Sequence, residues 1–215
     1  MIKNPFCEIR GAAIAAATAV ILVVLSIAPN RVAAEESRDV RMPFLSAAPE
    51  VGLIFFNGVS MKAKENGETA KLNISSRTGI IFKIQGNLFG DGLGLEFNPF
   101  VTHTWTGDDK VGKLVAVGAQ LGIAYRFHIR SFYPKIGVGG HFAYLDGDID
   151  SGVELYGRFP VGFSYYFMRF LAFDMEVAYM TGSTGIKTKG AGVFDEKIRH
   201  DHSHGLEVVL GLRFP

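Results

Sequence analysis

The chain has 215 residues, a length that suits one domain, and it is rich in glycine (26 residues) and aromatic side chains (12%). Its formal net charge of +1 excludes the strongly basic balance that is typical of nucleic-acid binding. Its one cysteine, Cys7, excludes an intramolecular disulfide framework and a site built from several thiolates.

The first 34 residues have the pattern of a secretory signal peptide. Lys3 and Arg10 come before an uncharged apolar run over Gly11–Ala28, and small side chains then lead to a polar stretch from Glu35 onward. This pattern predicts cleavage between Ala34 and Glu35, with an uncleaved membrane anchor as the alternative. After this segment, no apolar run is long enough for a transmembrane helix.

From residue 50 onward, apolar and polar residues alternate in eight segments. Alternation with a period of two predicts β-strands with two different faces, and a tilted strand of about 9–11 residues can cross a bilayer. Pro99 and Pro160 fall inside two of the segments, where the missing N–H donor predicts β-bulges. The expected strands are Glu50–Met61, Thr78–Gly86, Gly92–Trp105, Leu114–Phe127, Tyr133–Leu145, Val153–Tyr166, Leu171–Thr181 and His204–Phe214.

The connections between these strands alternate in length. Three are short ("NLFGD", "HIRSF" and "FMRF"), and the four others are polar and mostly longer, up to "GSTGIKTKGAGVFDEKIRHDHS". Short turns at one end and longer loops at the other are typical of a membrane barrel. The sequence therefore predicts an all-β fold, an eight-stranded antiparallel up-and-down transmembrane β-barrel.

The charged residues of the strands share one face with many small residues. Small side chains and balanced charges suit a narrow, packed interior, in which an unpaired ion would cost several kcal/mol. We therefore expect the apolar face to meet lipid; a soluble barrel with an apolar interior is the alternative. The expected interior ions are the acids Glu96, Glu154, Asp174, Glu176 and Glu207 and the bases Lys83, Arg126, Lys135, Arg158 and Arg213.

The first and the last strand differ in how clearly their two faces can be told apart. The segment Glu50–Met61 is apolar on both faces, so its register cannot be assigned. In the last strand, Leu210 has lipid-facing parity and Gly211 has interior parity, which predicts that a serine at Gly211 is tolerated better than an arginine at Leu210.

The last strand, "GLEVVLGLRF", carries apolar residues at alternate positions and ends on an aromatic residue that Pro215 follows. With this strand, the chain resembles the small eight-stranded outer-membrane barrels of the OmpA transmembrane domain and OmpX type. The resemblance implies a barrel over residues 50–215 after a periplasmic lead (35–49), in the Gram-negative outer membrane, in contact with its lipid and lipopolysaccharide. It also implies an assembly signal for the barrel assembly machinery at Leu206, Val208, Leu210, Leu212 and Phe214.

The function that we expect is non-enzymatic: a structural or surface-interaction role through the extracellular loops, without catalytic residues, cofactor or metal. A narrow transporter of small apolar molecules is one alternative, and it needs an apolar hole in the interior or the wall. A lipid A-modifying enzyme is another. However, "RHDHSHG" places His200, His202 and His204 on one strand face and Ser203 on the other, so it offers no serine and histidine on one face. The three histidines leave a metal-binding rim as a further hypothesis.

Overall fold

The computed structural model describes residues 41–57, 59–65, 68–74, 76–106, 113–147, 150–188 and 203–215. The expected signal peptide, residues 1–34, lies outside these ranges. Within them, no helix is long and apolar enough to cross a membrane.

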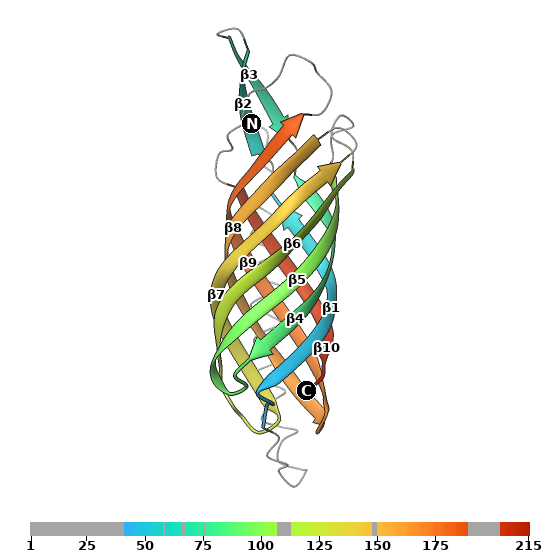
Figure 1. Ribbon diagram of the computed structural model, residues 1–215, viewed down its shortest axis with the longest axis vertical. Helices are drawn as coiled ribbons and strands as arrows, with labels where there is room; N and C mark the ends of the chain where they lie inside the picture. Colours follow the sequence, from blue (N-terminus) through green and yellow to red (C-terminus); the bar gives the residue numbers. More distant parts are fainter. Residues whose placement is uncertain are drawn as a thin grey trace, which may run out of the picture. The chain divides into compact units, whose positions relative to one another are not determined.

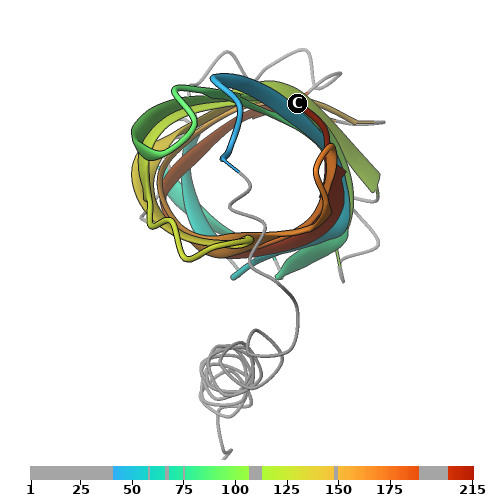
Figure 2. The same cartoon turned by 90° about the horizontal axis from the view of Figure 1, so that it is seen from below.

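Eight antiparallel strands close into a barrel (Figure 1), and Figure 2 shows the ring from one end. Each strand pairs with its neighbours in the chain, and the first and last strands pair to close the ring, which confirms the expected fold. The remaining two strands form a separate two-stranded sheet within the first long connection. The barrel strands are β1 (Leu45–Phe56), β4 (Arg77–Leu88), β5 (Gly92–Thr106), β6 (Lys113–Arg126), β7 (Phe132–Gly147), β8 (Asp150–Met168), β9 (Leu171–Thr188) and β10 (Ser203–Arg213), and the separate pair is β2 (Val59–Glu65) and β3 (Glu68–Ile74).

The first strand differs most from expectation. β1 begins at Leu45, inside the segment expected as a lead, and ends at Phe56. The sequence does not show where β1 begins, because Ser46, Ala47 and Ala48 differ little in polarity between the two faces. β8 and β9 are also longer than expected, and their pairing continues to Asp150 and Thr188.

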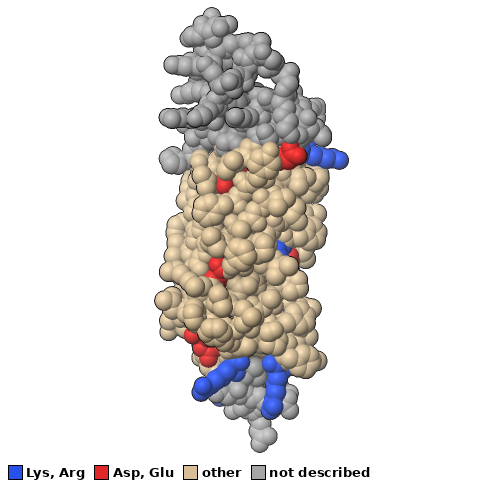
Figure 3. All heavy atoms as spheres, in the orientation of Figure 1, with Lys and Arg blue, Asp and Glu red and all other residues tan. Residues whose placement is uncertain are grey.

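The two faces of the barrel have opposite character. Outward positions carry large apolar side chains that are strongly exposed, such as Leu93 (64%), Val117 (61%) and Ile136 (55%). Figure 3 shows this surface as a broad tan band, with charged side chains mostly toward its ends. Because such an extensive apolar band is stable only against hydrocarbon, the barrel spans a membrane, and its closure leaves no strand edge unpaired there. The expected inside-out arrangement is confirmed.

The predicted bulges at the strand prolines are wrong. Near Pro99, the β4–β5 ladder stops after Lys83↔Phe100 and resumes at Gly86↔Phe97, in the same register. The β7–β8 ladder has a similar gap beside Pro160, again without a shift in register. A proline removes one donor on one side of a strand, and this barrel accommodates the loss as a local gap in hydrogen bonding rather than as an extra residue.

Candidate functional site

The barrel interior near the short turns is filled with charged side chains. The structure places all the predicted interior ions there or toward the opposite mouth, all of them buried, and adds Glu50 and Arg77. Six buried acids therefore face six buried bases among the described residues: Glu50, Glu96, Glu154, Asp174, Glu176 and Glu207 against Arg77, Lys83, Arg126, Lys135, Arg158 and Arg213.

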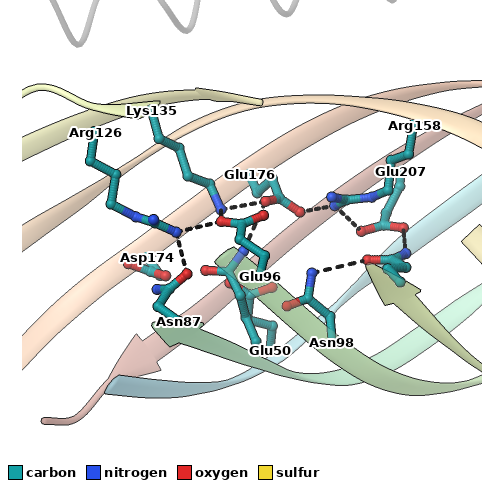
Figure 4. Close-up of polar contacts among 12 residues, drawn as sticks. Glu50, Asn87, Glu96, Asn98, Arg126, Lys135, Arg158, Asp174, Glu176 and Glu207 are labelled. Atoms are coloured by element: carbon teal, nitrogen blue, oxygen red, sulfur yellow. Dashed lines mark hydrogen bonds and ion pairs between the residues drawn. The ribbon is translucent and has the colours of Figure 1, made fainter. Parts of the chain in front are cut away.

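Glu176, on β9, is the centre of this ionic layer. Its carboxylate lies 2.5 Å from the Nζ atoms of both Lys83 and Lys135, and it pairs with Arg158. The Gln85 amide also donates a hydrogen bond to it, over 2.8 Å. Figure 4 shows Glu176 between Lys135 and Arg158. Since Lys83 lies on β4 and Lys135 on β7, this one carboxylate connects strands that are not neighbours in the ring.

A second carboxylate, that of Glu207 on β10, shares two of these cations. It lies 2.6 Å from Lys83 Nζ and 3.0 Å from Arg158 Nη2. Lys83 also pairs with Glu50 over 3.2 Å, so one lysine neutralises parts of three carboxylates. Shared partners of this kind make the charges interdependent, because the loss of any one ion leaves several others undercompensated.

The layer continues toward the short turns in two branches. In one, Lys135 lies 3.1 Å from Glu96, which also pairs with Arg126. In the other, Arg213 Nε donates to both carboxylate oxygens of Asp174, at 3.1 and 3.0 Å. Arg213 also donates to Gln85, which in turn bonds Glu176. The expected cluster of Glu176 and Arg158 with Asp174 and Arg213 is therefore joined through an amide.

The interior near the long connections has a different lining. Arg77 pairs with Glu154 there, and the Arg77 guanidinium lies 4.5 Å from the ring centre of Phe56. Around this pair, most buried side chains are apolar, so the expectation of a charged lining holds for only part of the interior. The apolar cluster consists of Ile54, Phe56, Ile81, Phe100, Leu114, Ala116, Ala143, Leu145, Tyr156, Met180 and Val209.

Two polar side chains connect the apolar half with the ionic layer. Gln120 donates to Glu207 over 2.7 Å, and its Nε2 lies 3.3 Å from His141 Nδ1. The other ring nitrogen of His141 lies 3.5 Å from Glu154. The polar contacts therefore run from the Arg77–Glu154 pair to Arg126 and Arg213, across most of the interior.

The mouth at the short-turn end is covered by the chain just ahead of β1, residues 41–44, which we call the strap. Figure 2 shows this segment turning into the opening. Met42 is buried against Tyr133, Tyr166 and Ala172, and its N–H donates to the Tyr133 hydroxyl over 3.0 Å. The strap is held to the first short turn, because Phe89 N–H donates to the Phe44 carbonyl over 2.8 Å.

Sequence reasoning missed several of these residues for traceable reasons. Glu50 could not be assigned to a face, because the segment that it begins is apolar on both faces. Arg77 stands one position ahead of the strand expected from Thr78. Gln85 and Gln120 were visible on the polar face but carry no charge, so a count of ions passes over them. Met42 could not be recognised as a buried residue, because no alternating pattern of apolar residues surrounds it in the segment ahead of β1.

Among the described residues at the long-connection end, Ser203 and His204 lie on opposite faces of β10. Ser203 is fully buried and its hydroxyl donates to Asn57, whereas His204 lies on the outer face with its Nδ1 2.6 Å from the Tyr179 hydroxyl. His200 and His202 lie outside the described residues. Within the described part of the chain, no group of three or more histidine, cysteine or acidic residues could hold a metal ion.

The residues of the expected assembly signal lie along the outer face of β10. Leu210, Leu212 and Phe214 are each 43–44% exposed, and Leu206 and Val208 are half-buried. Phe214 also takes part in closing the ring, since it exchanges two backbone hydrogen bonds with Ala47, of 2.8 and 3.0 Å.

Solved structures share this architecture. The outer membrane protein OprG from Pseudomonas aeruginosa is 16% identical and superposes with a TM-score of 0.57, covering 82% of this chain and 97% of its own. The chain has the fold of the small outer-membrane barrels. The outer membrane protein AlkL, solved in DMPC lipid bilayers, is also similar (15% identity, TM-score 0.51, 84% of this chain and 93% of its own). No protein-family model matches the sequence, and no curated protein matches it.

The fold and the lipid-facing surface together place the protein in an outer membrane. The three short turns, the start of β1 and the end of β10 all lie at one end of the barrel (Figure 1). In outer-membrane barrels, the short turns face the periplasm and the long loops face outward. The strap therefore covers the periplasmic mouth, and the apolar half of the interior lies toward the outside.

Proposed function

We propose that the protein is a non-enzymatic scaffold in the outer membrane that holds its extracellular loops for contact with an external ligand. The observation that carries this proposal is the ionic layer, in which Glu176 joins β4, β7, β8 and β9 across the lumen. An eight-stranded barrel leaves room only for side chains, and here those side chains are bonded to one another. Such an interior favours rigidity over diffusion of solutes.

The first long connection supports a role at the surface. It contains the hairpin β2–β3, whose register pairs Lys62 with Lys71 and Glu65 with Glu68. The sequence of this connection supplies the lysines Lys62, Lys64 and Lys71, which offer positive charge to an anion. We therefore infer an anionic ligand, such as a lipopolysaccharide phosphate or an acidic polysaccharide, with lipid and the barrel assembly machinery as the remaining partners.

This proposal is tested by retention of the refolded protein on immobilised dextran sulfate. Lys62→Gln with Lys71→Gln is expected to weaken retention several-fold at low ionic strength, because two cations are lost. The matched control, Glu65→Gln with Glu68→Gln, changes the other pair of the hairpin and is expected to retain or strengthen binding. Equal loss in both variants, or no retention of the unaltered protein, would remove the support for an anionic ligand.

A narrow transporter of small apolar molecules is a second candidate function, and the apolar cluster in the outward half of the interior favours it. Conductance in planar bilayers and uptake of a small apolar dye into vesicles separate the two. The scaffold is expected to give neither steady channels nor uptake. Dye uptake that Ile54→Asp abolishes would favour transport, since Ile54 is a fully buried member of that cluster.

A further inference from the structure

Arg126 uses only part of its guanidinium for hydrogen bonds, although it is fully buried. It lies on β6, at the short-turn end of the ionic layer. Its Nη2 atom donates to Asn87 and to Glu96, and Figure 4 shows both contacts. Its Nε and Nη1 atoms have no hydrogen-bond partner among the described residues. Because a buried donor without a partner is costly, such a group usually marks a bound water or ion.

A second buried group without a partner lies close to Arg126. Within the described part of the chain, the Tyr166 hydroxyl on β8 makes no hydrogen bond, and Tyr166 is 3% exposed. The charges of Arg126 and Arg213 both act on this hydroxyl, and such interactions weaken with distance. The register agrees, since Arg126 lies opposite Lys135. Tyr133, two residues before Lys135, has its ring centre 5.6 Å from that of Tyr166.

The strap closes this space toward the periplasm. Met42 packs against Tyr133 and Tyr166, and its N–H donates to the Tyr133 hydroxyl over 3.0 Å. Phe89, whose N–H donates to the Phe44 carbonyl, fixes the strap and has a φ of 69°, which bulky residues rarely adopt. Backbone strain of this kind persists only where the surrounding structure enforces it, as at ligand clamps. The closed strap therefore separates the unpartnered donors from solvent.

The unpartnered groups beneath the strap have hydrogens to donate. The Nε atom of Arg126 carries one hydrogen and its Nη1 atom two, and the Tyr166 hydroxyl adds one more. The nearby acids are engaged by bases, because Glu96 pairs with Arg126 and Lys135. Asp174 pairs with an arginine of β10. A ligand that only accepts hydrogen bonds fits these donors better than water, whose own two hydrogens need acceptors.

From these groups, we propose that the barrel binds a small inorganic anion of the size of chloride beneath the strap, between the Arg126 guanidinium and the Tyr166 hydroxyl. The anion supplies the acceptor that both groups lack, and its hydrogen bonds to the guanidinium are charge-assisted. Bound there, it connects β6 to β8 and extends the ionic layer to the periplasmic mouth. The site is independent of the loop function proposed above.

The test compares anions that have the same charge and different sizes. The refolded protein, in vesicles of zwitterionic lipid, is unfolded with urea in sodium chloride, bromide or gluconate at equal concentrations. An anion that binds only the folded state stabilises it by mass action. The ratio of folded to unfolded protein should therefore rise about a hundredfold when the chloride concentration is about 100 times its dissociation constant. We expect this saturating gain with chloride and bromide and none with gluconate, which is too large for a closed site.

Two tyrosine variants locate the effect. Tyr166→Phe removes one donor and keeps the ring, so half-saturation should need several-fold more chloride. Tyr156→Phe is the matched control, since the Tyr156 hydroxyl is bonded to Thr184 in the outward half of the interior, and it should leave the chloride dependence unchanged. The heat-dependent gel shift verifies that each variant is folded.

A second measurement needs no variant. In crystals of the unaltered protein grown with bromide, the anomalous signal should place the ion beside Arg126 and Tyr166. Equal stability in chloride and gluconate, a half-saturation that Tyr166→Phe leaves unchanged, or crystals without this bromide signal would each show that the donors bind water only and would overturn the proposal.

Discussion

At the scale of single residues, the interior shows how a buried charge is kept in a membrane protein. Each ion there has lost its hydration, which close partners of opposite sign and side-chain amides replace. The Asp174–Arg213 pair is the simplest case, because Asp174 accepts from one arginine through both oxygens, while Glu176 depends on three cations. Removing one partner therefore destabilises the fold strongly, whereas removing both partners together costs much less stability.

The Asp174–Arg213 pair gives the cleanest test of this interdependence. Arg213→Met leaves a buried carboxylate alone, and we expect it to lower the free energy of unfolding by about 3–5 kcal/mol. Asp174→Asn together with Arg213→Met should cost less than the sum of the two single changes. The measurement is a double-mutant cycle by urea titration in lipid vesicles. Strictly additive losses would show that the two side chains are not coupled.

A second residue-scale prediction concerns the two faces of β10. Leu210→Arg puts a charge on the lipid face and should cost about 2–4 kcal/mol near mid-membrane. The serine expected to be tolerated at Gly211 is no longer a fair comparison, since a Cβ there would come within 2.4 Å of the Pro49 carbonyl oxygen. Val209→Thr, a nearly isosteric change at a buried interior position, is the better control and should be milder. The reverse order in urea titration would contradict the inside-out assignment.

At the scale of elements, alternation alone predicted seven strands and their faces, because in those segments lipid-facing and interior residues differ sharply. It failed where that contrast is weak. β1 starts among alanine, serine and proline, and its second half places Ile54 and Phe56 inside, so both faces look apolar. The hairpin β2–β3 is not predicted either, because the expected first strand runs on to Met61 and the rest of the hairpin falls in a polar connection. Asn66-Gly67 between two short alternating runs is a recognised hairpin signal. The inward position of the charged residues follows from the alternation alone, whereas the hydrogen bonds that link them through Gln85 and Gln120 are visible only in the structure.

The strap gives a prediction for an element that the sequence did not reveal. An added Cβ at Gly90 would come within 2.3 Å of the Met42 carbonyl oxygen and 2.7 Å of that of Pro43. Gly90→Ala should therefore push the strap away from the first short turn and expose Met42, which is now 5% exposed. Oxidation of Met42 by peroxide, followed by mass spectrometry, should become faster. Gly157→Ala, where the nearest atom is 3.6 Å away, should leave the rate unchanged; no difference between the two variants would mean that the strap does not cover Met42 tightly.

At the scale of the whole molecule, the barrel depends on one seam between the ends of the chain. β1 pairs with β4 along its full length, from Leu45↔Leu88 to Phe56↔Arg77, but with β10 only from Glu50↔Gly211 to Phe56↔Gly205. Beyond Glu50, the seam continues through the contact of Ala47 with Phe214. Between the end of the ladder at Glu50 and the contact at Ala47, the pairing is interrupted at Pro49, which has no N–H to donate. Ring closure at the periplasmic end therefore depends on the last residues of the chain.

Truncation separates the contributions of these last residues. Removing Pro215 alone leaves both hydrogen bonds between Phe214 and Ala47 in place, so stability in vesicles should not change. Removing Phe214 as well deletes the two bonds, each worth about 0.5–1.5 kcal/mol, together with an aromatic side chain at the lipid boundary. We expect a lower midpoint in the heat-dependent gel shift and slower folding into vesicles, because the closing seam would then end at Glu50↔Gly211. If both truncations behaved like the full chain, the ring would be closed by the β1–β10 ladder alone, and the aromatic end would contribute nothing to its closure.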